Sequence, residues 1–201
     1  MSPVSSDVDA HGIMRWEMSR CNDTLIKQRG VYIRMNEERI GGEKNLVVCF
    51  TGHRNIARAV AVRLPSLLDQ VLTGLCEQGA TVFRAGGAIG FDTVAALKVL
   101  ELKKRYPHIR LELILPCRNQ TEYWEETAVR TYRYILEHAD SHRYLFDSYV
   151  DGCMQARDRR LVDGSDICVA YCNRSRGGTA YTFAYALRAG VEVINLHDLL
   201  E

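Results

Sequence analysis

The chain has 201 residues, of which 47% are hydrophobic and 25% are charged. This profile is typical of one globular domain with an extension rather than of two full domains. The formal net charge is only +1, which argues against a binder of long polyanions, since such proteins carry a basic excess or a basic stripe. We therefore do not expect nucleic acid to be the partner.

Two further absences bear on location. No continuous apolar run approaches the roughly 18 residues of a membrane span, and the first residues lack the apolar core of a secretion signal. Seven cysteines without such a signal indicate reduced thiols in the cytoplasm. Cys168 and Cys172 have no second pair or nearby histidine to complete a zinc site, so we expect buried thiols and no metal.

Residues 1–43 are predicted to be an N-terminal extension that is partly flexible or draped over a domain spanning 44–201. Glycine and serine recur in this segment, and only residues 31–35 alternate enough to predict a short strand. A role in binding a partner is the alternative for the extension.

From residue 45 onward, apolar runs alternate with amphipathic stretches. The runs predict strands at 45–50, 81–85, 111–115, 142–146, 166–171 and 191–196. Between them, helices are expected at 65–79, 92–106, 119–139, 151–163 and 177–190, the first opened by Pro65 after a loop.

This alternation predicts an α/β fold: a Rossmann-like open, mostly parallel sheet of five to seven strands with helices on both faces. Its crossovers should be right-handed. Ligands of such sheets bind beyond the carboxyl ends of the strands. The rule selects the loops that follow Phe50, Ala85, Leu115 and Tyr171.

The loop at 85–92 reads AGGAIGFD, between a predicted strand and a predicted helix. Gly86, Gly87 and Gly90 could let a phosphate approach the first amides of the helix, or could simply allow tight packing. Asp92 either caps that helix or contacts the ligand; because a carboxylate repels phosphate, the contact would be a ribose hydroxyl or a base N–H. If the protein is an enzyme, Asp92 is also the candidate for its catalytic carboxylate.

A second glycine pair, Gly177 and Gly178, also lies between a predicted strand and a predicted helix and is followed by Thr179. Bare backbone, a hydroxyl and the nearby charges of Arg174 and Arg176 fit phosphate binding. The alternative is an ordinary loop with a threonine cap.

Thr51, Gly52, His53 and Arg54 follow the first strand of the domain. His53 can act as a general acid or base, stack on a base, bind a ribose, or be structural. We expect this loop to close one side of the pocket.

Three further positions are candidates for the cleft. Gln120 or Tyr123 can line a base pocket, although Tyr123 can equally serve the core. Arg157 lies in a mixed-charge run that usually forms a solvated helix face, but it can turn toward the cleft.

Taken together, CFTGHR, GGAIGFD, PCRNQTEYW and RGGT occur in a distinctive order. Over residues 46–196 the chain resembles the YpsA-like branch of the SLOG superfamily, which also contains DprA-type DNA-processing proteins and LOG phosphoribohydrolases. The resemblance implies a Rossmann-like fold and a site for a nucleotide-derived ligand such as ADP-ribose or an NAD-like molecule, built from the loops at 51–54, 86–92 and 177–179.

One departure from the LOG pattern matters. The glutamate that LOG enzymes place after their glycine-threonine pair is replaced here by Thr182, so cleavage of an N-glycosidic bond would need another carboxylate, such as Asp92. The leading hypothesis is a binding or sensor domain for a nucleotide derivative that needs no further cofactor. The alternatives are an N-glycosidic hydrolase and a DprA-like DNA-interacting protein. A homodimer is compatible with the fold.

Overall fold

The structure, a computed structural model, describes residues 23–28, 31–36 and 45–200. The chain divides into two units, residues 1–42 and 43–201. In the first unit, β1 (Asp23–Gln28) pairs antiparallel with β2 (Val31–Asn36). The short strand predicted at 31–35 is therefore present. The flexibility predicted for the remainder of residues 1–43 concerns residues outside the described part.

The second unit is built on a parallel sheet, and all six predicted strands are confirmed. They are β3 (Leu46–Gly52), β4 (Ala80–Ala85), β5 (Arg110–Cys117), β6 (Ser141–Phe146), β7 (Ile167–Tyr171) and β8 (Glu192–Asn195). Their order across the sheet is β6-β5-β4-β3-β7-β8, and every neighbouring pair is parallel.

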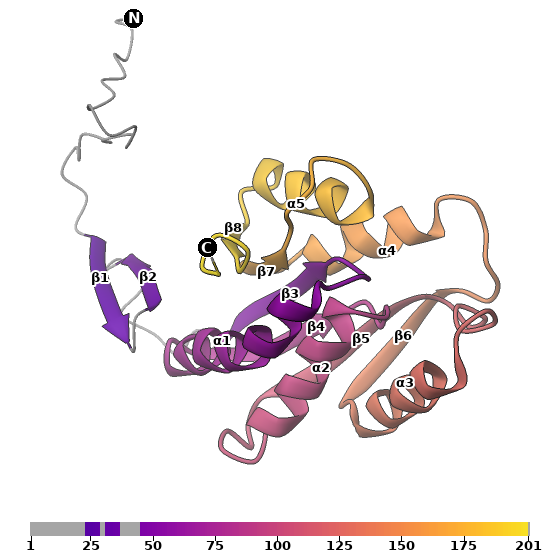
Figure 1. The fold of residues 1–201 in the computed structure, drawn as a ribbon, viewed down its shortest axis with the longest axis horizontal. Coiled ribbons are helices and arrows are strands. Elements are labelled where there is room, and N and C mark those ends of the chain that lie inside the picture. Colours follow the sequence, from indigo (N-terminus) through magenta and orange to yellow (C-terminus); the bar gives the residue numbers. More distant parts are fainter. Residues whose placement is uncertain (1–22, 29–30, 37–44, 201) are drawn as a thin grey trace, which may run out of the picture. The chain divides into compact units, whose positions relative to one another are not determined.

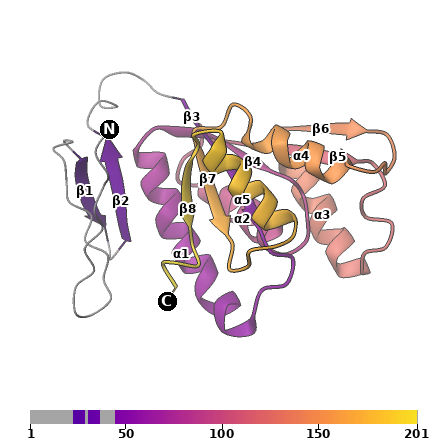
Figure 2. The ribbon, with the colours of Figure 1, turned by 90° about the horizontal axis from the view of Figure 1, so that it is seen from above.

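Five helices connect the strands and cover the sheet. They are α1 (Arg58–Glu77), α2 (Phe91–Leu102), α3 (Glu126–His138), α4 (Cys153–Val162) and α5 (Gly178–Arg188). Helix α2 packs beside both α1 and α3, whereas α4 packs beside α5 on the opposite face (Figure 1). Seen from above, α5 lies over the β7–β8 side of the sheet and α4 over the β5–β6 side (Figure 2).

The burial of the strands explains their apolar sequences. All five residues of β7 are buried, as are most of β3, because helices cover these central strands on both faces. The edge strands β6 and β8 contain no buried residue. Phe50 anchors the core: its ring lies 6.2 Å from that of Phe83 and 6.4 Å from that of Phe91, centroid to centroid.

Two predicted helix starts were wrong. Helix α1 begins at Arg58, and Pro65 lies inside it rather than at its first position. Alanine- and arginine-rich residues form two further turns before the proline, and these residues favour helix. Helix α3 begins at Glu126, not at 119, because residues 118–123 form turns.

Helix α1 is also the one described helix whose length and apolar composition would suit a membrane span, although the sequence held no continuous apolar run of that length. Its apolar stripe is accounted for by the domain itself. Leu64, Leu68, Val71, Leu72 and Leu75 are all fully buried, so these side chains stabilise the fold rather than face lipid.

The strand order contains a reversal in winding between β3 and β7. From β3 the chain proceeds through β4 and β5 to β6 at one edge, then returns to β7 on the other side of β3 and continues outward to β8. In open α/β sheets the crevice beyond such a reversal is where ligands bind. This placement directs attention to the carboxyl ends of β3 and β7.

Candidate functional site

A cavity of about 300 Å³ opens at the reversal between β3 and β7. The end of β3, the loop after it, the β4–α2 segment and helices α4 and α5 form its walls. The lining residues are Phe50, Thr51, Gly52, Arg54, Ala88, Asp92, Met154, Arg157, Asp158, Leu161, Gly178, Thr179 and Thr182. This volume is at the lower end for small-molecule sites.

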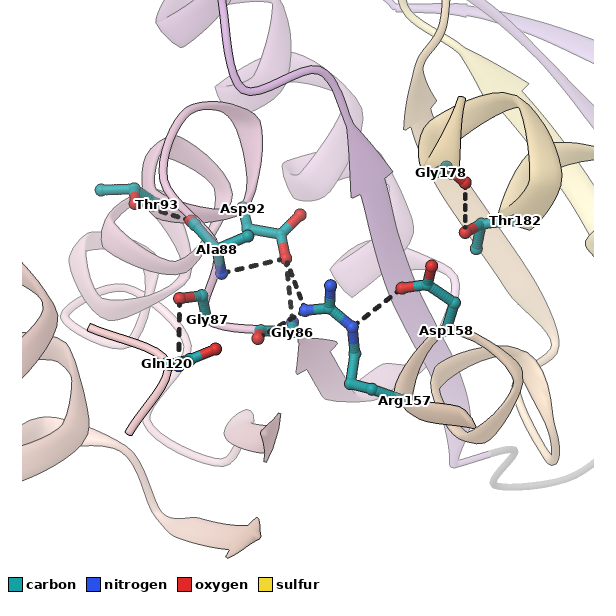
Figure 3. A network of polar contacts seen from close by, with 10 residues as sticks. All are labelled: Gly86, Gly87, Ala88, Asp92, Thr93, Gln120, Arg157, Asp158, Gly178 and Thr182. Carbon is teal, nitrogen blue, oxygen red and sulfur yellow. Dashed lines mark hydrogen bonds and ion pairs between the residues drawn. The ribbon is translucent and has the colours of Figure 1, made fainter. Parts of the chain in front are cut away.

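A buried guanidinium between two carboxylates forms one wall of the cavity (Figure 3). Arg157 Nε donates to Asp158 Oδ1 at 2.8 Å, and Arg157 Nη1 lies 3.7 Å from Asp92 Oδ2. Arg157 Nη1 also donates to the carbonyl oxygen of Gly86 at 2.6 Å. The three charged side chains are at most 12% exposed, so the mutual pairing offsets the cost of removing them from water.

Burial changes the proton affinity of both carboxylates. Desolvation raises the pKa of Asp92 from 3.8 to about 6, although Arg157 and the amides of Ala88 and Gly86 act in the opposite direction. The pKa of Asp158 is also raised by desolvation, against the effect of Arg157. A carboxyl group that titrates near neutrality is suited to hold or transfer a proton.

Asp92 should make the stability of the domain depend on pH. Because its pKa is raised on folding, the folded state holds this proton more tightly, so the contribution to stability is full below the ordinary pKa and is lost as the pH rises through about 6. Asp92→Asn should remove this loss. We expect the free energy of unfolding of the variant, relative to wild type, to rise by about 2 kcal/mol between about pH 4 and pH 7.

Urea denaturation at several pH values measures this difference. Other carboxylates titrate in both proteins and largely cancel when the two curves are subtracted. A difference that does not change with pH would contradict a raised pKa for Asp92.

The first glycine loop is organised around Asp92 itself. Asp92 Oδ2 accepts the amide N–H of Gly86 at 3.2 Å and of Ala88 at 3.4 Å, so these two amides already have an anionic partner. A Cβ on Gly86 would overlap the Arg157 guanidinium, and one on Gly90 would overlap the backbone of Arg54. The glycines therefore permit close packing, and none of Gly86, Gly87 and Gly90 lines the cavity, whereas Ala88 and Asp92 do.

Gly87 has a similar packing role. Its φ is +67°, and a Cβ there would overlap Leu115. Asp92 itself does not cap α2 in the usual way: Gly90 is the cap residue, and no side chain bonds there. Asp92 instead lines the cavity and holds the preceding loop.

The second glycine pair is open. Gly177 has φ +101° and precedes the first residue of α5, Gly178. Both are exposed, and a Cβ at Gly177 would meet nothing within 4 Å, while one at Gly178 would lie 4.0 Å from Asp158 Oδ2. Gly178 and Thr179 line the cavity. The first amides of a helix have no partner within the helix, and they carry its positive dipole end.

Residues of the loop after β3 have two different roles. His53 is buried, and its Nε2 accepts the N–H of Asn173 at 3.1 Å, which ties this loop to the one after β7. Burial and Arg174 lower the pKa of His53, consistent with a neutral ring that accepts this bond. His53 does not line the cavity, whereas Thr51, Gly52 and the exposed Arg54 do.

Gln120 and Tyr123 do not reach this cavity. They line a neighbouring one of about 620 Å³, which shares Arg54 and Met154 with the first. The residues expected at a single pocket are thus divided between two adjoining spaces.

Sequence reasoning missed two polar residues of the cavity, Asp158 and Thr182. Asp158 stood in a charge run that looked like a solvated face, yet only 9% of it is exposed. Thr182 is 1% exposed, and its hydroxyl donates to the carbonyl oxygen of Gly178 at 2.9 Å. A buried face of α4 was signalled by Cys153, Leu161 and Val162, which flank the charges on that helix.

Several known proteins are similar to this chain. The UPF0398 protein of Brevibacillus brevis is 36% identical over 98 residues, which cover 47% of this chain and 52% of that protein. The UPF0398 protein of Halalkalibacterium halodurans is 30% identical over 140 residues, or 65% of this chain and 74% of its own length. The prophage-derived YoqJ of Bacillus subtilis is 27% identical over 149 residues, which cover 67% of this chain and 85% of that protein. The alignment thus spans about half of the first relative and more of the others.

Two solved structures share the fold. DNA processing protein A of Streptococcus pneumoniae aligns with a TM-score of 0.55 and 17% identity over 75% of this chain and 50% of that one. The Helicobacter pylori protein of the same name, described as binding single-stranded DNA, aligns with a TM-score of 0.54 and 18% identity. The alignment covers 74% of this chain and 64% of that one. The model of the YspA SLOG family (YpsA) matches residues 49–193. The chain therefore belongs to the YspA SLOG family.

Proposed function

We propose that the cavity binds a small nucleotide-derived molecule, such as ADP-ribose or an NAD-like compound, and that the domain acts as a binding or sensor module. The observation that carries the proposal is that the exposed amino end of α5 lines the cavity. Gly178 and Thr179 present backbone amides and a hydroxyl there, in the arrangement that favours phosphate. Arg54, which also lines the cavity, adds positive charge.

The carboxylates have a different part in the proposal. Asp92 and Asp158 repel phosphate, but they accept hydrogen bonds from ribose hydroxyls. Both line the cavity, and Arg157 holds them in place. A phosphate at the start of α5 and a ribose over the carboxylates would use every charged group of the cavity.

One observation also favours the hydrolase alternative. The carboxylate that the α5 sequence lacks, where Thr182 stands, is supplied from α4 by Asp158, close to Gly178. Together with Asp92 it gives two carboxyl groups of raised pKa in one cavity, and such groups assist cleavage at an anomeric carbon.

A DprA-like role in binding DNA draws on the shared fold alone. The net charge of +1 does not supply the several phosphate contacts that a polynucleotide requires. A cytoplasmic location is likewise part of the proposal. It is supported by the six cysteines of the described residues, all of which are free thiols.

One experiment can test both nucleotide binding and the role of the start of α5 in it. We expect ADP-ribose, NAD or AMP to stabilise the wild-type protein by about 2.7 kcal/mol at a hundred times its dissociation constant. Gly178→Asp should abolish that stabilisation, because the carboxylate of the new aspartate would occupy the phosphate position. The helix itself should tolerate the change, since a negative charge at its amino end interacts favourably with the helix dipole. Thr127→Asp, which adds the same charge in the first turn of α3, should respond like wild type.

Thermal denaturation with and without each nucleotide gives the answer, and chromatography of the same mixtures shows the fate of the ligand. Intact ligand supports a binding module, whereas free base or ribose phosphate supports the hydrolase. If no nucleotide stabilises the wild-type protein, the proposal is wrong.

A further inference from the structure

The space beside the first cavity has its own chemistry. It measures about 620 Å³, and we call it the aromatic groove because Tyr123, Trp124 and Tyr149 line it. Ile89 and Met154 add apolar surface. Since Arg54 and Met154 line both spaces, a single ligand can extend from one into the other.

The aromatic side chains of the groove are exposed where a folded domain usually covers them. Tyr123 is 92% exposed and Tyr149 is 57% exposed, and both are among the large apolar side chains that the domain leaves in water. Trp124 is held edge-on against Tyr132, with ring centroids 5.6 Å apart. Exposed rings beside a cavity offer faces on which a planar base can stack.

Hydrogen bonds hold the wall of the groove in one shape. Asn119 Oδ1 accepts the amide N–H of Tyr149 at 2.9 Å, and Asn119 Nδ2 donates to Glu122 Oε2 at 3.1 Å. The amide of Trp124 donates to the carbonyl oxygen of Thr121 at 3.0 Å. These contacts tie the turn before α3 to the loop before α4, so the groove is formed before any ligand arrives.

The charges of the two cavities indicate which part of a nucleotide each would bind. The groove contains the carboxylates Glu122 and Glu125, which repel phosphate and accept hydrogen bonds from amino groups. Amides at the start of α5, which attract phosphate, lie at the other cavity. We propose that the aromatic groove binds the base of the nucleotide whose phosphate lies at α5, and that this base carries an exocyclic amino group, as adenine does. This assignment rests on the proposed function.

The test separates base from phosphate by calorimetry with three probes on the full chain: AMP, IMP, which lacks the amino group, and ribose 5-phosphate, which lacks the base. The double variant Tyr123→Ala/Tyr149→Ala should bind AMP about tenfold more weakly, the effect of losing base stacking, and ribose 5-phosphate with unchanged affinity. Tyr134→Ala is the matched control, because Tyr134 is 49% exposed on α3 and outside the groove.

Each outcome decides a different point. If the double variant and wild type bind AMP with equal affinity, the groove assignment is wrong, but the proposed phosphate site is unaffected. The groove assignment is also wrong if the double variant loses affinity for AMP and for ribose 5-phosphate to the same extent. Equal binding of AMP and IMP by wild type would overturn the amino-group assignment. Binding of none of the three probes by wild type would overturn the proposed function itself. An adenine oligonucleotide that binds far more tightly than AMP, with a steep salt dependence, would assign the groove to single-stranded nucleic acid instead.

Discussion

Gly90→Ala is expected to lower the free energy of unfolding by about 3 kcal/mol. Two independent penalties combine at this position. Gly90 has φ +89° and ψ −125°, a conformation that residues with a Cβ rarely adopt. A Cβ would also lie 2.3 Å from the carbonyl oxygen of Arg54, and backbone cannot move aside as a flexible side chain can.

Gly177→Ala separates the two penalties. Gly177 has φ +101° and ψ −179°, again a conformation that residues with a Cβ rarely adopt, but a Cβ there would meet nothing within 4 Å. The loss of stability in Gly177→Ala should therefore be limited to a backbone term of about 1 to 2 kcal/mol. Urea denaturation of the three proteins measures both values, and equal losses at the two glycines would show that the contact with the Arg54 backbone is not what requires a glycine.

Arg157→Met should destabilise the domain by about 3 kcal/mol near neutral pH. Methionine fills similar apolar volume, but Asp92 and Asp158 then remain buried without the guanidinium that pairs with both. Because Arg157 lowers the pKa of Asp92 in the wild-type protein, its removal raises that pKa above about 6, and protonation of Asp92 then relieves the cost. The loss should therefore shrink as the pH falls toward about 6.

Arg130→Met is the surface counterpart. Arg130 pairs with Glu126 on α3, where the two side chains are 68% and 82% exposed, and such pairs contribute little. We expect a change within about 0.5 kcal/mol and no dependence on pH in this range. An Arg157→Met loss as small as that of the control would mean that the buried trio does not stabilise the fold.

The fold was predictable because its signals are local. Short continuous apolar runs such as 45–50 and 166–171 are typical of strands that are buried on both faces of a sheet. Strands of this kind that alternate with helices are compatible with only a few topologies. The starts of α1 and α3 were not predictable in the same way. Pro65 is usual in a first helical turn but is held here inside α1, and the turns at 118–123 depend on bonds to distant partners, such as that from Gln120 to Gly87 at 3.5 Å.

The candidate site was predictable only in outline. The sheet rule selected the loops, and the residue at position 178 indeed opens α5 beside the cavity. Nothing local, however, revealed that the carboxylate of Asp92 would accept the amides of its own loop. Nor did the sequence show that Asp158 would turn inward, since the direction of a charged side chain on a helix is decided by which face the sheet covers.

The reversal between β3 and β7 has a mechanical consequence. One side of the cavity belongs to the part of the chain wound toward β6, and the other to the part wound toward β8. A molecule seated there acts as a non-covalent cross-link between two stretches of chain that are distant in sequence. Its arrival should slow amide hydrogen exchange in α2 and α5 together, because neither helix can then lift from the sheet without breaking the contacts of both.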